Sequence, residues 1–288
     1  MDLLIFLETL SPRAEYVFKH IFVKQLGLEI EFTTQINDFI SSDKPKLSYT
    51  KSAITNSIFF YSHSLLYEST IVEQDINLSV YKKNPVFFLS SNSKSALPFD
   101  PFAATFYMLS RYEEYLAHKK DKFSRFSASE SLAFKHNFLQ TPVVDRWILL
   151  IKEVLMKAYP NLTFRPHNFT YLNTIDVDNA FAYLEKGVFR TIGAVIRSIV
   201  QLKYKDFFER FAVLFLLKKD PYDTYEQALA IHKKYNLKTI IFFLLANYGQ
   251  LDRNVSYKSL KHQSLIQHLK KFCDIGIHAS YSSNWNLK

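Results

Sequence analysis

The chain has 288 residues, of which 48% are hydrophobic and 22% charged, and it carries a formal net charge of +9. This composition is typical of a globular protein, and the length suffices for one large domain or two ordinary ones. With only 5 glycines and no GxGxxG or Walker pattern, a glycine-rich phosphate loop is disfavoured, and the single cysteine, Cys273, argues against an internal disulfide or a cysteine-rich metal site.

The first 160 residues have the pattern of an α/β domain. Ser11 and Pro12 are a typical N-cap and first helical residue, and Gly27 is a typical helix stop. Asp100 and Pro101 start a second helix in the same way. The apolar periodicity predicts strands at 2–7, 28–33, 47–49, 57–61, 76–81 and 86–89, and helices at 12–26, 101–116 and 145–159.

The pattern changes after residue 160, and we expect a second domain at 161–288. An extended segment at 168–176 ends in acidic residues, and the continuous apolar run at 238–246 is typical of a buried parallel strand. Strands separated by helices indicate a parallel β/α domain. The remaining predicted elements are helices at 188–202, 206–217, 223–235 and 259–272, and a strand at 274–278.

Two of these predicted strands end in side chains that can bind a metal or transfer a proton. Asp176 and Asp178 end the first, and His278 ends the last. Active-site residues of parallel β/α folds lie at the carboxyl ends of the strands. One carboxylate can bind a divalent cation while the other remains a base, and a neutral imidazole is a common zinc ligand. As isolated features, however, such acids are more often a helix N-cap and a solvated turn residue.

The segment Thr174-Ile175-Asp176-Val177-Asp178-Asn179 resembles the first motif of the polysaccharide deacetylases, also called carbohydrate esterase family 4 or the NodB-homology domain. The resemblance implies that Asp176 is the general base and that Asp178 and His278 are metal ligands. It also implies a distorted parallel β/α barrel, of which this chain contains the first half. The cofactor implied is a divalent metal, with zinc favoured.

The similarity is closest to deacetylase-like proteins of the Bacteroidetes type, which carry an N-terminal domain of unknown function. The helix from Asp100 to Tyr115, the segment from Pro142 to Asp145, and the segment from Asp220 to Thr224 all resemble that group. The resemblance thus extends over most of the chain.

The sequence also departs from the family pattern. Ser282 stands four residues after His278, where the family has a second histidine, so Ser282 is the candidate third metal ligand. The family's later motifs, an arginine that orients the base and a histidine that acts as general acid, would follow Lys288. We therefore expect the chain to be a fragment or a truncated form of the domain.

Two functions are consistent with these observations. One is metal-dependent hydrolysis of N-acetyl groups on sugars during surface polysaccharide metabolism, with Asp176 removing a proton from water. The other is a non-catalytic carbohydrate-binding or scaffold protein that keeps the fold. Both predict an N-acetylated sugar or polysaccharide as partner.

Basic residues are concentrated between Lys186 and Lys219, where eight lysines and arginines accompany two acidic residues. Nucleic acid is disfavoured as a partner because no known binding motif is present. Ile192, Val195, Ile196 and Ile199 form an apolar stripe in this region, for which we favour core packing over contact with an anionic membrane surface. No segment predicts a transmembrane helix or a signal peptide, which favours a cytoplasmic protein. His232, His262 and His268 are expected at the surface of helices.

Overall fold

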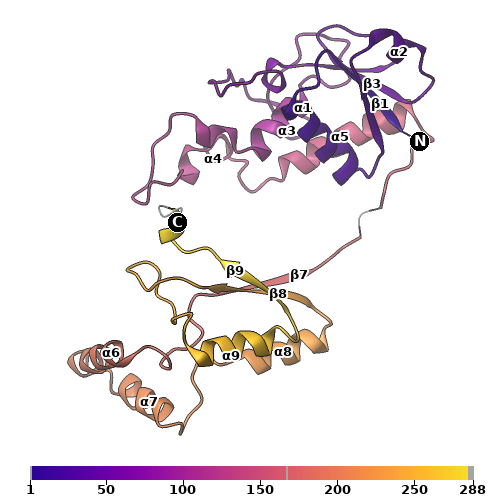
Figure 1. Cartoon of the computed structure of the whole chain (residues 1–288). Coiled ribbons are helices and arrows are strands. Elements are labelled where there is room, and N and C mark those ends of the chain that lie inside the picture. Colours follow the sequence, from indigo (N-terminus) through magenta and orange to yellow (C-terminus); the bar gives the residue numbers. More distant parts are fainter. Residues whose placement is uncertain (1, 167, 285–288) are drawn as a thin grey trace. The chain divides into compact units, whose positions relative to one another are not determined.

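The computed structural model describes residues 2–166 and 168–284 (Figure 1). The chain divides into two compact units, residues 1–167 and 168–288, and the sequence predicts a boundary near residue 160. Both units combine helices with a parallel sheet, so the predicted α/β class is confirmed. None of the described helices has the length and apolar character needed to cross a membrane.

The first unit is built on a four-stranded parallel sheet in the order β2-β1-β3-β4. All five side chains of the central strand β1 are buried, as expected for a strand with apolar neighbours on both faces. A short antiparallel pair, β5 and β6, lies apart from this sheet. The strands are β1 (Leu3–Leu7), β2 (Ile30–Thr33), β3 (Lys46–Thr50), β4 (Ile58–Tyr61), β5 (Ser79–Tyr81) and β6 (Asn84–Val86).

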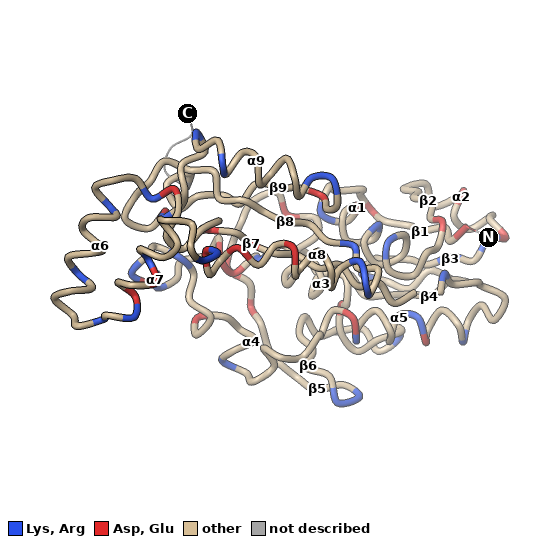
Figure 2. Tube along the Cα trace, turned by 90° about the horizontal axis from the view of Figure 1, so that it is seen from below, with Lys and Arg blue, Asp and Glu red and all other residues tan. Residues whose placement is uncertain are grey.

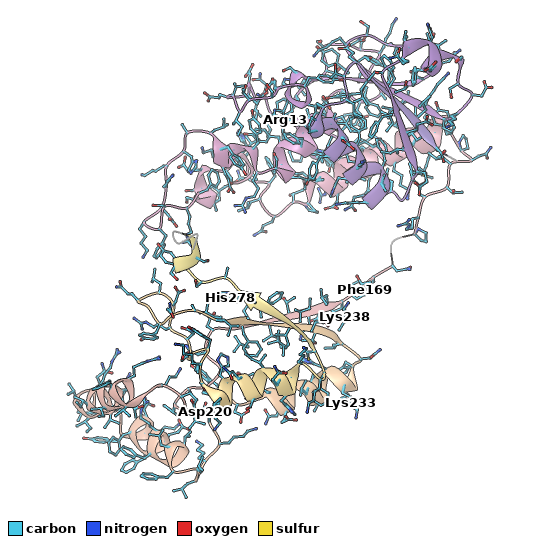
Figure 3. All side chains as sticks on the ribbon, viewed as in Figure 1. Arg13, Phe169, Asp220, Lys233, Lys238 and His278 are labelled. Carbon is cyan, nitrogen blue, oxygen red and sulfur yellow. The ribbon has the colours of Figure 1, made fainter. Side chains whose placement is uncertain are left out.

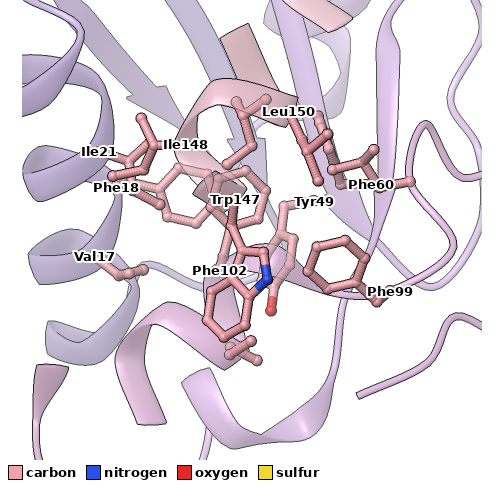
Figure 4. Close-up of a cluster of buried hydrophobic side chains, with 14 of the residues drawn as sticks. Val17, Phe18, Ile21, Tyr49, Phe60, Phe99, Phe102, Trp147, Ile148 and Leu150 are labelled. Carbon is pink, nitrogen blue, oxygen red and sulfur yellow. The ribbon is translucent and has the colours of Figure 1, made fainter. Parts of the chain in front are cut away.

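Helices pack against this sheet around an aromatic core (Figure 4). The rings of Phe18 and Phe102 stack with their centroids 4.3 Å apart, and the Nε1 atom of the buried Trp147 donates a hydrogen bond to the Pro85 carbonyl at 2.9 Å. The α-helices are α1 (Pro12–Phe18), α2 (Ile36–Ser41), α3 (Pro101–Leu109), α4 (Leu132–Lys135) and α5 (Val143–Ala158). A π-helix at Lys19–Gln25 continues α1, and short 3₁₀ turns cover Ser64–Leu66, Tyr112–Tyr115 and Ala128–Glu130.

The start of α3 follows the prediction, but its end does not. The Asp100 carboxylate caps the helix, since its Oδ1 atom accepts from the N–H groups of Phe102 at 2.9 Å and Ala103 at 3.0 Å. The predicted continuation to residue 116 is wrong. Arg111 adopts the left-handed conformation, with φ of 54°, and ends the α-helical geometry.

The second unit contains a three-stranded parallel sheet in the order β7-β8-β9. Its strands are β7 (Leu172–Val177), β8 (Lys238–Leu244) and β9 (Asp274–His278). Its helices are α6 (Val188–Val200), α7 (Tyr204–Leu214), α8 (Tyr225–Lys234) and α9 (Leu260–Leu269), followed by a 3₁₀ turn at Ser282–Asn284.

Helices α8 and α9 lie against one face of this sheet (Figure 1). Ile241 and Phe243 of β8 are buried there against Leu269 of α9. The prediction that His232 and His262 lie at the surface is wrong, because both are buried on the inner sides of these helices, whereas His268 is half-exposed.

Helices α6 and α7 form a hairpin between β7 and α8 (Figure 1). The predicted core packing of the α6 apolar stripe is wrong, because Ile192, Ile196 and Ile199 are all exposed. The less exposed side of α6 instead carries Ala194 and Ser198. A stripe at helical spacing can indicate a buried face, but it does not specify what covers that face.

Candidate functional site

The carboxyl ends of β7 and β9 bring together two of the residues singled out in the sequence. Asp178 directly follows β7, and His278 is the last residue of β9. Their Oδ1 and Nδ1 atoms are 3.9 Å apart, which is too long for a hydrogen bond. The Nδ1 atom of His278 is buried and has no hydrogen-bond partner in the described part of the chain. A buried polar atom without a partner is costly, so this nitrogen is suited to bind something further.

Asp176 lies on the sheet face opposite α8 and α9. Its position pairs with Phe242 of β8, which in turn pairs with Gly276 of β9. The Asp176 side chain is exposed, and within residues 2–166 and 168–284 it forms no hydrogen bond or ion pair. Side chains two residues apart on a strand point to the same face, roughly 7 Å apart along it. The Asp176 carboxylate is therefore available beside Asp178.

Gly276 makes room for an aromatic ring on this face. A Cβ atom at position 276 would lie 2.4 Å from Cδ1 of Phe242. The ring of Phe242 thus extends from the middle strand across Gly276 of the edge strand. The ring makes the sheet surface between Asp176 and β9 apolar.

Ser282, the candidate third ligand, lies in the 3₁₀ turn after β9. Its hydroxyl is 3.0 Å from the hydroxyl of Ser280, and its N–H donates to Asp252 at 3.0 Å. Neither of these interactions connects Ser282 with Asp178 or His278. The structure therefore brings Asp178 and His278 together, with Asp176 on the adjoining strand position, and shows no contact from Ser282 to them.

Asp252 fixes the loop that follows His278, a role that the sequence did not indicate. The side chain is buried, and its carboxylate accepts from the N–H groups of Tyr281 at 2.7 Å and Ser282 at 3.0 Å. Burial opposes ionisation of this carboxyl, but these hydrogen bonds outweigh it and hold the pKa of Asp252 below its ordinary value. The ionised Asp252 carboxylate thus holds the backbone of this loop in place.

Asp220 serves the loop after β7 in the same way. Its buried carboxylate accepts from the backbone N–H groups of Ala182, Tyr183, Leu184 and Tyr222. Burial again raises the pKa of Asp220, and the four N–H donors more than compensate, so that its pKa lies below the ordinary value. In the sequence, Asp220 stands out only as part of the segment that resembles the deacetylase-like group. Its local signal is the tendency of aspartate to accept from nearby backbone N–H groups.

Two further polar residues hold the strand-end loops. Asn254 donates from Nδ2 to the carbonyls of Leu244 at 3.2 Å and Ala246 at 2.7 Å, directly after β8. Lys186 donates to Oδ1 of Asn179 at 2.6 Å. Burial, with a contribution from nearby arginines, lowers the pKa of Lys186 to about 8.

The donor set can be compared with what a divalent metal requires. Two ligands on a tetrahedral zinc, with bonds of about 2.1 Å, place their donor atoms roughly 3.4 Å apart. The observed 3.9 Å between Asp178 and His278 is close to this separation, and both donor types suit zinc. These two residues therefore fit as part of a metal site. No group of three or more His, Cys, Asp or Glu residues able to hold a metal occurs among the described residues.

Comparison with known proteins gives a match to a family model. A model of a protein family of unknown function, DUF7033, matches residues 3–160, which is more than half of the chain. No curated protein and no solved structure matches the chain.

Proposed function

The chain belongs, through residues 3–160, to a protein family of unknown function, DUF7033, and we propose that its second unit is the first part of a metal-dependent polysaccharide deacetylase-like domain. The reaction is hydrolysis of the acetamide bond of an N-acetylated sugar, which yields acetate and a free amine. The observation that carries this proposal is the buried Nδ1 atom of His278, which lies 3.9 Å from the carboxylate of Asp178 and has no hydrogen-bond partner among residues 2–166 and 168–284.

The arrangement of the sheet supports the proposal. Three parallel strands have helices on one face, while Ile240 and Phe242 on the opposite face remain partly exposed. The first strands of a distorted β/α barrel would have these features. In a complete barrel, the face of each strand opposite the helices is covered by the other strands of the barrel. Asp178 and His278 lie at the carboxyl ends of their strands, where barrel enzymes carry their active sites.

Each residue at the strand ends has a distinct role in this proposal. Asp178 and His278 would hold a divalent cation, with zinc favoured. When bound there, the cation would supply Lewis-acid chemistry toward the acetyl carbonyl. Asp176, whose carboxylate is exposed and lies on the same strand, accepts a proton from the attacking water. Asp252 and Asp220 hold the two loops that border the site, so its ligands stay in position without reorganisation.

A second function is favoured by Ser282. Its hydroxyl is engaged with Ser280 rather than with the strand-end pair, and it stands where the resembling family has a histidine ligand. A carbohydrate-binding or scaffold protein that kept the fold and lost part of the metal site would show this arrangement.

The deacetylase proposal is tested by acetate release from N-acetylated oligosaccharides, with the protein that carries the complete deacetylase-like domain. Asp176→Asn should lower the rate by roughly a hundredfold to ten-thousandfold, the range for loss of a general base, while zinc binding is retained. The matched control is Asp274→Asn, at the opposite end of β9 and also exposed. Undiminished release by Asp176→Asn refutes the role of Asp176. Binding of the oligosaccharide by wild-type protein without any acetate release favours the non-catalytic alternative.

A further inference from the structure

The α6–α7 hairpin, residues 188–217, has its apolar side turned outward. On α6, Ile196 is 56% exposed and Phe189 is 92% exposed. Residues 189, 192, 196, 199 and 200 lie on one side of the helix at 100° per residue, while the less exposed Ala194 and Ser198 lie on the other. The helix therefore presents its large apolar side chains to the exterior, while Arg190 contacts its own unit by lying over the ring of Tyr248.

The end of α7 carries a second group of exposed apolar side chains. Phe215, Leu216 and Leu217 follow the last turn of this helix, and Leu216 and Leu217 are 80% and 82% exposed. Single exposed apolar residues are ordinary, but a contiguous group of this kind marks an interaction surface. The hairpin thus has a surface that needs an apolar partner.

Lysine and arginine residues are spread along the α6–α7 hairpin (Figure 2). Eight basic and two acidic residues lie between Lys186 and Lys219. Lys218 pairs with Glu209 and Lys219 with Asp223. In the described part of the chain, Arg197, Lys203 and Lys205 form no salt bridge, and all three are exposed. The partner should therefore be apolar and anionic together.

We propose that the α6–α7 hairpin is a docking surface for an anionic lipid bilayer. Amphipathic helices that combine an apolar face with lysine and arginine lie in the headgroup region of such membranes. At 13 residues and 1.5 Å per residue, α6 is about 20 Å long, which is shorter than the hydrocarbon core of roughly 30 Å, so the hairpin lies on the bilayer rather than across it. The proposal concerns a different surface from the strand-end site and does not depend on deacetylation.

The test is flotation of the whole chain with vesicles of neutral phosphatidylcholine, with or without about a third of anionic phosphatidylglycerol. We expect binding to the anionic vesicles at low salt, weaker binding to neutral vesicles, and loss of binding at high salt. Ile196→Ser should lower the partition coefficient about tenfold, because a large apolar side chain no longer enters the bilayer. Arg197→Gln should lower it about fivefold, the share of one basic residue near the surface.

The matched controls come from the first unit. The exposed fraction of Ile40, 52%, is similar to the 56% of Ile196. Ile40→Ser therefore removes an equally exposed side chain from a different part of the chain. Arg146 is also exposed, and Arg146→Gln removes a charge there. Both control variants should bind vesicles as the wild type does. Hydrogen exchange of the β8 amides, unchanged in all four variants, would show that the second unit remains folded.

Three results would overturn the proposal. The first is no binding to anionic vesicles at low salt, and the second is an equal loss of binding in Ile40→Ser and Ile196→Ser. The third is a dimer in sedimentation velocity that Ile196→Ser dissociates while vesicle binding is absent, since a second copy of the chain would then cover the hairpin.

Discussion

The Nδ1 atom of His278 lies 3.9 Å from the Oδ1 atom of Asp178, at the carboxyl ends of two strands that are separated in the sheet by β8. Figure 3 shows His278 at the end of its strand and Asp220 near the loops below the sheet. This nitrogen is buried without a hydrogen-bond partner in the described chain, and we propose that the pair serves as two ligands of an ion.

Removing the support behind the β9 loop should loosen it. In Asp252→Ala, the N–H groups of Tyr281 and Ser282 lose their carboxylate acceptor. A hydrogen bond to a charged group contributes about 1.5–3 kcal/mol, so these amides should exchange hydrogen about tenfold faster or more. Hydrogen exchange with mass spectrometry would measure this, with Asp274→Ala as the control. Unchanged protection at residues 281 and 282 would contradict the assigned role of Asp252.

Gly276 should be intolerant of a side chain. The added methyl group of Gly276→Ala would lie 2.4 Å from the Phe242 ring, and we expect a loss of about 1–3 kcal/mol in the free energy of unfolding of the second unit. The matched control is Gly193→Ala in α6, where a Cβ atom meets nothing within 4 Å. That change should be neutral or stabilise by about 0.5–1 kcal/mol, since alanine favours the helix. Urea denaturation, monitored through hydrogen exchange of the β8 amides, would measure the free energy of unfolding of both variants. Equal effects of the two substitutions would contradict the close contact between Gly276 and Phe242.

Asp100 should make the stability of the first unit depend on pH. Burial raises the pKa of Asp100 from 3.8 to about 6, although Tyr49, His63, Phe102 and Ala103 all donate hydrogen bonds to it. Between about pH 4 and 6 the folded state therefore binds more protons at this group than the unfolded chain does. The contribution of Asp100 to stability falls as pH rises through this window and is constant above it.

Urea denaturation at several pH values would measure how the free energy of unfolding changes with pH. Unfolding would be monitored through the fluorescence of the buried Trp147, in a Trp285→Phe background. Asp100→Asn should remove the Asp100 share of the slope, whereas Asp43→Asn, at an exposed site, should leave it unchanged. We expect the wild type to lose stability relative to Asp100→Asn as pH rises from 4 to 6. A gain in the wild type's free energy of unfolding relative to the variant over this range would contradict the raised pKa of Asp100.

Most strands and long helices could be predicted because their signals are local. Asp100 followed by Pro101 specified the start of α3, and the apolar run after Lys238 specified β8. By contrast, α2 was missed. It is a short helix whose final carbonyls accept from Nζ of the buried Lys46, a residue of the next strand. Such a cap depends on tertiary packing and leaves no periodic signal.

The site shows the same division. The proximity of Asp178 and His278 could be expected because the carboxyl ends of parallel strands share one edge of the sheet. Asp252 could not be found, since it accepts from N–H groups about 30 residues further along the chain and no local pattern marks that contact. The outward orientation of Ile196 was also missed, because an apolar stripe looks the same whether it is buried or exposed.

Zinc binding by the chain tests the strand-end site most directly. Competition with a chromophoric chelator at neutral pH would give the affinity of the wild type and of His278→Ala, with Asp274→Asn as the control. We expect one zinc per chain in the wild type and in Asp274→Asn, and a loss of affinity of about tenfold to a hundredfold or more in His278→Ala. Zinc affinity that is the same in all three proteins, or no zinc binding by the wild type, would contradict a metal site built on Asp178 and His278.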